Sequence, residues 1–167
     1  MGDSFDRASG EGMRTRPDYG EAAPGSVQAM YKLGDFSEGS GLERPLLELV
    51  KTHVSQINGC ASCVDVHTKD AGASGESEQR LYGLLSAWRE SPYYSERERA
   101  ALAWAEAVTN IPQVYESDEE YEAARAQFSA EELVKLTVVV IAINGWNRLA
   151  TASREPAGTH KASAATA

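Results

Sequence analysis

Apolar residues recur along most of this chain at the three- and four-residue spacing that one face of an α-helix requires. The pattern is clearest after Pro45, where Leu46, Val50, Val54 and Ile57 form one apolar stripe. Comparable spacing predicts helices over residues 26–33, 45–57, 60–71, 76–88, 96–109, 118–128 and 130–152. We therefore predict an all-α fold, a single bundle of about seven helices.

Local signals mark where several of these helices begin and end. Three Ser-x-x-Glu capping boxes precede helical spacing, and they pair Ser95 with Glu98, Ser117 with Glu120, and Ser129 with Glu132. Glycines at both ends of residues 34–41 predict a loop there. The β-branched run 137–141 could form a strand, but the cap before it and the helical spacing after it favour a buried helix.

The chain is long enough for one domain with a substantial core. Residues 1–22 are polar and without periodicity, so we expect a flexible N-terminal arm. Residues 23–154 carry the helical pattern and form the predicted domain. Small residues and a proline dominate residues 155–167, which predicts a flexible C-terminal tail.

Composition narrows the class of protein further. The net charge of −9 argues against nucleic-acid binding, because neutralising phosphates requires a basic face. No apolar run approaches the roughly 20 residues that span a bilayer, so we expect no membrane association. The N-terminus lacks the apolar segment of a secretory signal, which makes the cytoplasm the expected location.

The two cysteines of the chain, Cys60 and Cys63, lie one helical turn apart, and His67 follows one turn later. On a helix these three residues fall within about 60° of arc. Gly59 suggests that the pair begins a helix, whose positive end favours a thiolate. In a reducing compartment such a pair is more often catalytic, redox-sensing or metal-binding than structural.

Glu48, twelve residues before Cys60, is the candidate partner of the histidine. Its helical phase is nearly opposite the centre of the apolar stripe, as expected of a solvated residue. However, Thr52 and Ser55 share its side of the helix and are small enough for another helix to approach. The phase therefore permits a buried carboxylate, and the residues alone predict a redox or metal site.

The arrangement Glu48…Cys60-x-x-Cys63-x-x-x-His67 resembles that of the alkylhydroperoxidase D-like (AhpD-like) proteins of the carboxymuconolactone decarboxylase superfamily. Flanking segments over residues 55–60, 64–68, 75–78, 88–92, 102–105 and 143–148 are also similar, so the resemblance covers about residues 26–153. It implies a helical homo-oligomer, commonly a trimer or hexamer. It also implies a peroxidase or disulfide reductase that binds no metal or flavin cofactor.

The resemblance also implies roles for the site residues. Cys63 would attack a hydroperoxide, Cys60 would be the resolving and more exposed cysteine, and Glu48 with His67 would relay protons. The reductant would be an external dithiol such as a lipoyl group on a partner protein. Some family members have a second histidine between the cysteines, where this chain has Ser62. The order of the two cysteines could also be reversed, as in thioredoxin-type pairs.

Two alternatives use the same residues. One is a non-enzymatic redox sensor whose disulfide alters a partner surface. The other is a zinc site made by the two cysteines, the histidine and the carboxylate. Cysteine and histidine on one helical turn seldom converge on a metal with good geometry, so we prefer the redox interpretation. Apolar residues such as Trp104 and Trp146 add to the expectation of an oligomer.

Overall fold

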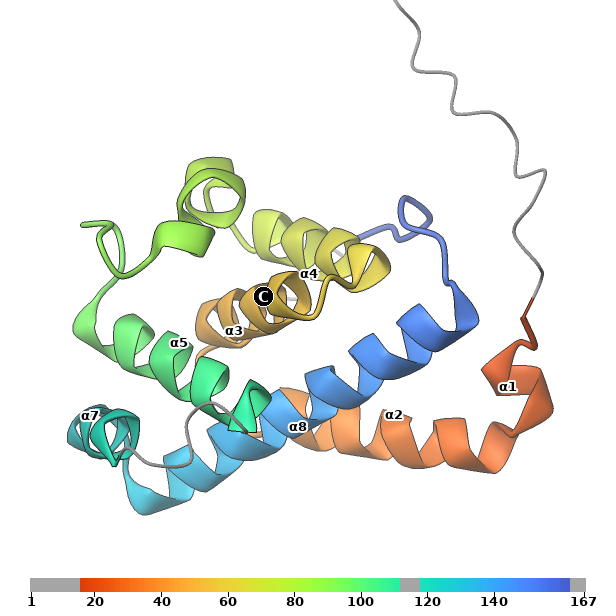
Figure 1. Cartoon of the computed structure of the whole chain (residues 1–167), viewed down its shortest axis with the longest axis horizontal. Helices are drawn as coiled ribbons and strands as arrows, with labels where there is room; N and C mark the ends of the chain where they lie inside the picture. The colour runs from red at the N-terminus through yellow and green to blue at the C-terminus, as the bar shows by residue number, and fades with distance from the viewer. Residues whose placement is uncertain (1–15, 112–117, 163–167) are drawn as a thin grey trace, which may run out of the picture.

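The computed structural model describes residues 16–111 and 118–162, and in this part of the chain every regular element is a helix (Figure 1). The α-helices are α1 (Tyr19–Ala22), α2 (Pro24–Glu38), α3 (Arg44–Ile57), α4 (Ala61–Ala73), α5 (Glu96–Thr109), α7 (Glu119–Gln127) and α8 (Ala130–Ser153). Between α4 and α5 lie a π-helical segment, Gln79–Leu84, and a 3₁₀ turn, Leu85–Ala87. The predicted all-α class is confirmed.

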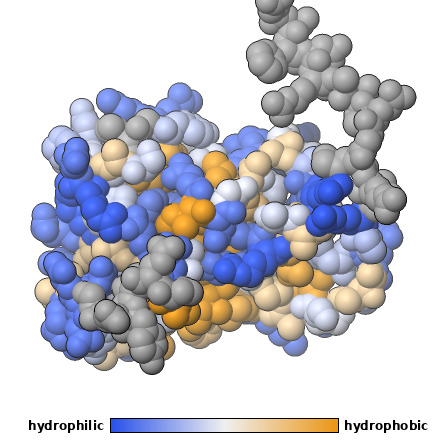
Figure 2. Space-filling model, viewed as in Figure 1, coloured by the Kyte–Doolittle hydropathy of each residue, from blue (hydrophilic) through white to orange (hydrophobic). Residues whose placement is uncertain are grey.

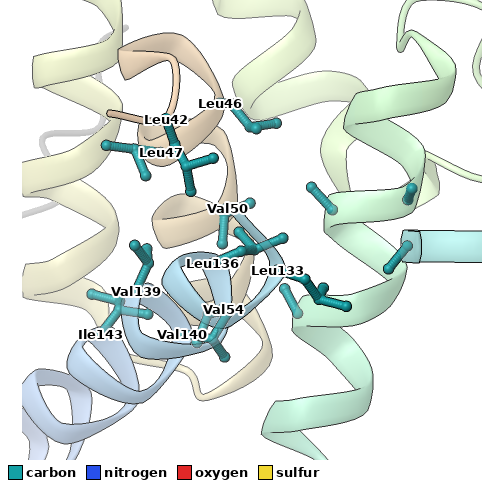
Figure 3. Packing of buried hydrophobic residues seen from close by; sticks show 14 of the residues in the cluster. Leu42, Leu46, Leu47, Val50, Val54, Leu133, Leu136, Val139, Val140 and Ile143 are labelled. Atoms are coloured by element: carbon teal, nitrogen blue, oxygen red, sulfur yellow. The ribbon is translucent and has the colours of Figure 1, made fainter. Parts of the chain in front are cut away.

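Helix α3 is the centre of the molecule and packs against α4, α5 and α8. On one side its apolar stripe meets α8, where Val50 and Val54 lie beside Leu136 and Val140 (Figure 3). On the other side Leu49 joins a second apolar cluster with residues that follow α4. Because both sides are covered, the polar residues in the middle of α3 are buried as well.

Two of the three predicted capping boxes are present. Ser95 and Ser129 each accept a hydrogen bond from the amide of the glutamate three residues later, and each glutamate bonds back to the serine amide. These boxes begin α5 and α8 where the sequence predicted. Ser117 lies outside the described residues, and α7 begins after Asp118.

The predicted loop over residues 34–41 is wrong in its first half, because α2 continues through Gly34 to Glu38. A glycine inside a helix costs only about 1 kcal/mol relative to alanine, which packing can offset. A Cβ at position 34 would lie 3.8 Å from Trp146 Nε1, so α2 and α8 pack closely at this point. The helix predicted over 76–88 is a π-helical segment followed by a 3₁₀ turn rather than a regular α-helix. Its expected apolar residues Leu81, Leu85 and Trp88 are buried.

The C-terminal end of α8 lies near α1 (Figure 1). Helix α1 falls within the region predicted as an arm, and the phenol of Tyr19 donates to Glu155 Oε2 at 2.9 Å. Residues 155–162, within the predicted tail, return to α4. The remainder of the predicted arm and tail, residues 1–15 and 163–167, lies outside the described residues.

By length and composition α8 could cross a membrane, which the sequence analysis did not anticipate. However, 44% of its apolar window is buried inside the molecule, against α2, α3 and α5. We therefore interpret α8 as a core helix. Figure 2 shows apolar residues in the lower half of the face, where α8 runs, and Val134 and Ile141 of this helix are exposed.

Candidate redox site

The turn between α3 and α4 positions the cysteine pair. Gly59 adopts φ +66°, a left-handed conformation that favours glycine, and so redirects the chain after α3. Cys60 is the N-cap of α4, and its amide donates to Ser55 O at 3.0 Å. Cys63 then lies in the first turn of α4, at the positive end of the helix dipole, where a thiolate is favoured.

A network of asparagine side chains, partly buried, holds this turn against α8. Asn58 Nδ2 donates to Asn144 Oδ1 at 3.0 Å and to Asn147 Oδ1 at 2.8 Å. Asn147, 1% exposed, in turn donates to Ser55 Oγ at 3.0 Å. Because these groups are paired and largely shielded from solvent, the network gives the cysteine turn a defined position.

The two sulfur atoms lie at disulfide distance, and the Cα atoms are 5.4 Å apart, within the usual range for a disulfide. The hydroxyl of Ser62 lies 3.5 Å from Cys60 Sγ and 4.0 Å from Cys63 Sγ. The residue that departs from the family pattern therefore places a hydrogen-bonding group beside both sulfur atoms.

The expectation that Cys60 is the more exposed cysteine is wrong in this structure. Cys60 is 2% exposed and Cys63 is 7% exposed. Both pack into the hydrophobic cluster that α3 and α8 form, and Cys63 also lines a cavity to which Cys60 does not contribute. A reactant in this cavity therefore lies beside Cys63 rather than Cys60.

Glu48 and His67 are brought together by the packing of α3 against α4. Glu48 Oε2 lies 2.8 Å from His67 Nδ1, and Glu48 is only 3% exposed. Burial by itself raises the pKa of Glu48, but the hydrogen bond and charge of His67, together with Lys51, hold that pKa below its ordinary value. An ionised Glu48 can only accept at this contact, so it favours the tautomer of His67 that carries a proton on Nδ1.

Lys51 is a site residue that the sequence analysis missed. Its ammonium group lies 3.2 Å from Glu48 Oε1 and also pairs with Glu38, while the residue is 6% exposed. The sequence does place Lys51 three residues after Glu48, and oppositely charged residues three apart on a helix are neighbours. This spacing could have indicated that Lys51 pairs with Glu48.

A cavity of about 360 Å³ adjoins the cysteines and the histidine. Cys63, Val66 and His67 contribute the α4 side of this cavity. Ser62 of α4 also lines it, and the remaining lining residues come from other segments and are Tyr19, Tyr31, Ile143, Trp146, Ala150, Glu155 and His160. The cavity can therefore hold a small, partly apolar molecule beside a thiol and a base.

The proposed zinc ligands do not converge as the sequence alternative required. Among the described residues, the group that brings metal-ligating atoms within 4.8 Å of one another is Glu48, His67 and Asp70, without a cysteine. Glu48 is already bonded to His67, and Asp70 Oδ1 lies 2.8 Å from His160 Nε2. The geometry favours a hydrogen-bonded network over a Cys₂His metal site.

Comparison with known proteins shows the family to which this fold belongs. Residues 26–107 match the carboxymuconolactone decarboxylase family. The uncharacterized protein YdfG of Bacillus subtilis (strain 168) is 41% identical over 140 residues, which is 84% of this chain and 95% of YdfG.

Solved structures share the architecture. ATU0492 from Agrobacterium tumefaciens, a protein of unknown function described provisionally as an antioxidant defence protein AhpD, is 45% identical with a TM-score of 0.83. The match covers 88% of this chain and all of that one. An uncharacterized peroxidase-related protein with an AhpD core from Ralstonia eutropha JMP134 has a TM-score of 0.73 over 84% of this chain and 74% of its own. At 19% identity it shows the fold alone.

Fold and site thus define a helical protein with a Cys-x-x-Cys pair at the start of a helix and a buried carboxylate–histidine pair beside it. The chain belongs to the carboxymuconolactone decarboxylase family, as an AhpD-like member.

Proposed function

We propose that this protein is a thiol-dependent peroxidase and disulfide reductase that uses Cys63, Cys60 and a Glu48–His67 proton relay. The observation that carries the proposal is the buried hydrogen bond between Glu48 and His67, beside the cavity that Cys63 lines. A histidine so held is a positioned general base for a thiol, and the helix N-terminus assists ionisation of that thiol.

In the oxidative half-reaction His67 accepts the proton of the Cys63 thiol. The thiolate attacks one oxygen of a hydroperoxide, so that an S–O bond forms and the O–O bond breaks. His67 returns the proton to the departing alkoxide, which leaves as an alcohol, and Cys63 becomes a sulfenic acid. The Cys60 thiol then attacks this sulfur, which forms the disulfide and releases water.

In the reductive half-reaction a dithiol donor restores the thiols. Because Cys63 lines the cavity and Cys60 does not, the donor thiolate attacks the sulfur of Cys63 and forms a mixed disulfide while the Cys60 thiolate leaves. The Ser62 hydroxyl, 3.5 Å from Cys60 Sγ, is placed to donate to that thiolate. The second donor thiol then displaces Cys63, so two electrons pass from the donor to the protein.

The partners of this cycle are a hydroperoxide and an external dithiol, for which a lipoyl group on a partner protein is our candidate. Thiol chemistry completes the cycle, so we propose no bound cofactor or metal. The cycle requires a reducing compartment, consistent with the cytoplasm.

The direct test is peroxide-dependent oxidation of a dithiol such as dihydrolipoamide. Wild type should turn over repeatedly, Cys63→Ser should not react with peroxide, and Cys60→Ser should stop at the sulfenic acid. Loss of turnover in both variants, with sulfenic acid trapped only in Cys60→Ser, supports the proposal. Turnover that survives Cys63→Ser would contradict it.

The 2% exposure of Cys60 also favours a second candidate, a non-enzymatic redox sensor. A disulfide that few donors reach would persist once formed and could alter a partner surface. A sensor would form the disulfide with peroxide but show no sustained turnover with any dithiol. The same assay, followed over many equivalents of donor, therefore separates the two functions.

A further inference from the structure

Residues 155–162 are hydrogen-bonded to α4, the helix that carries Cys63 and His67. Arg154 ends α8 at φ 62° and turns the chain back. The Gly158 amide then donates to Asp65 Oδ2 at 3.0 Å. Lys69 Nζ donates to the carbonyl oxygen of His160 at 3.1 Å.

Side chains of the segment add two further attachments. His160 Nε2 lies 2.8 Å from Asp70 Oδ1, and Glu155 Oε2 accepts from the phenol of Tyr19 at 2.9 Å. The segment is thus held at both of its ends, although its small residues and proline predicted a free tail. These contacts are polar, so the segment is attached by hydrogen bonds and ion pairs more than by apolar packing.

The same segment supplies part of the cavity wall. Cys63 and His67 contribute the reactive side of the cavity, whereas Glu155 and His160 contribute polar side chains that are partly open to solvent. The volume of about 360 Å³ is near the lower end of the roughly 300–1,000 Å³ typical of ligand sites. Displacing the segment would widen access to Cys63, because two wall residues belong to it.

We propose that residues 155–162 form a specificity-determining wall that admits slender hydroperoxides to Cys63 and excludes bulky ones. The substrate class is then hydrogen peroxide and unbranched alkyl hydroperoxides, while a branched aromatic compound such as cumene hydroperoxide reacts poorly. The choice of substrate rests on the proposed peroxidase function. The restriction of access to Cys63 does not depend on that function, because access to a thiol can be measured without peroxide.

The test of access uses reduced full-length protein in a Cys60→Ser background, where Cys63 is the one thiol. Alkylation rates are compared for a small reagent, iodoacetamide, and a bulky one, fluorescein maleimide. The double variant Asp65→Ala/His160→Ala removes the acceptor of the Gly158 amide and the contact between His160 and Asp70. We expect its bulky-to-small rate ratio to rise about tenfold, the discrimination that a modest steric contact supplies.

A second variant, Gly158→Ala, displaces the segment without removing a wall side chain. Gly158 has φ +95°, which an alanine rarely adopts, and a Cβ there meets nothing within 4 Å. The effect should therefore come from the backbone alone and in the same direction. Lys161→Ala changes an exposed residue of the same segment and should leave the ratio unchanged.

The same variants, with Cys60 restored, are then assayed with hydrogen peroxide and with cumene hydroperoxide. A rise in relative rate with cumene hydroperoxide, parallel to the alkylation ratio, supports the wall. If both segment variants have the same bulky-to-small alkylation ratio as wild type, the proposed wall is wrong. If alkylation ratios rise but neither hydroperoxide reacts with any form, the wall stands and the proposed peroxidase function fails.

Discussion

Glu48 and Lys51 are two opposite charges buried within one turn of the same helix. Burying an unpaired charge costs several kcal/mol, so each depends on its partners. Glu48 contacts both His67 and Lys51, and Lys51 also reaches Glu38, whose side chain is 52% exposed. The ammonium group thus stabilises the ionised carboxylate that keeps His67 in place.

Lys51→Met tests this role, because methionine retains an unbranched apolar chain but no charge. Loss of the cation should raise the pKa of Glu48, so Glu48 becomes protonated at a higher pH than in wild type. The acid limb of Cys63 alkylation against pH should therefore move to higher pH. Lys135→Met, which removes a surface partner of Glu131, is the matched control and should leave the profile unchanged. An acid limb that stays in place in Lys51→Met would contradict the role.

At the residue scale, spacing and resemblance together identified Glu48, Cys60, Cys63 and His67 as neighbours, and the structure brings them together. The burial of Lys51 could not be predicted, because it depends on how completely other helices cover α3. The exposure of Cys60 was mispredicted for the same reason, since its surroundings come from α8, far along the chain.

Helix α3 is buried along ten consecutive residues. His53 is a further polar residue in this stretch, and its ring makes contacts with other segments. His53 Nε2 lies 2.8 Å from Glu106 Oε1 on α5, and Trp88 Nε1 donates to the same oxygen at 2.8 Å. Burial raises the pKa of Glu106, but the hydrogen bonds of His53, Arg89 and Trp88 outweigh it and lower that pKa to about 2. This carboxylate therefore links α3 and α5 to the segment before α5.

Glu106→Gln should lower the free energy of unfolding at pH 7 by about 2 kcal/mol, since one pKa unit corresponds to about 1.4 kcal/mol and Glu106 remains partly solvated. The folded-state pKa lies below the ordinary value, so this stabilisation is fully present above about pH 4.5. It is lost as the pH falls toward 2. Urea unfolding at pH 7 and pH 3 measures the difference. A gap between wild type and variant that does not narrow at pH 3 would contradict this explanation.

At the element scale, most helices could be predicted because apolar spacing and capping boxes are local signals. Ser95 and Ser129 begin α5 and α8 as expected. The continuation of α2 past Gly34 could not be predicted, because a local helix-breaking signal is overridden by packing against Trp146. The docking of residues 155–162 depends on partners in α4 that are about 90 residues away in sequence.

At the scale of the whole molecule, exposed apolar side chains gather near the ends of α5 and along α8. Ile111, Val134 and Ile141 are 60%, 64% and 51% exposed. Ile111 and Ile141 also line a shallow groove with Val108, Thr137 and Gly145. Trp104 and Trp146, which suggested an oligomer from the sequence, are instead partly buried against the core. An oligomer remains our prediction, with its interface at this exposed patch.

Ile141→Lys should therefore convert an oligomer to smaller species. The lysine charge would be buried in an apolar interface without a partner, which is unfavourable. Light scattering coupled to size-exclusion chromatography measures the change at micromolar protein. Tyr93→Lys places the same charge at an exposed aromatic outside this patch and should leave the assembly unchanged. A monomeric wild type would contradict the prediction of an oligomer, and an intact Ile141→Lys oligomer would contradict the location of its interface.

In the proposed mechanism, the charge of Glu48 acts through His67 on the Cys63 thiol. The most direct measurement is the single-turnover rate of disulfide formation when reduced protein meets hydrogen peroxide, compared for wild type, Glu48→Gln and Glu38→Gln. Glu48→Gln should react about 10²–10⁴-fold more slowly, the contribution typical of a positioned acid–base group, and its apparent thiol pKa should rise. Glu38→Gln leaves the Glu48–His67 bond in place and should have a much smaller effect. A Glu48→Gln rate and thiol pKa equal to those of wild type would contradict the relay.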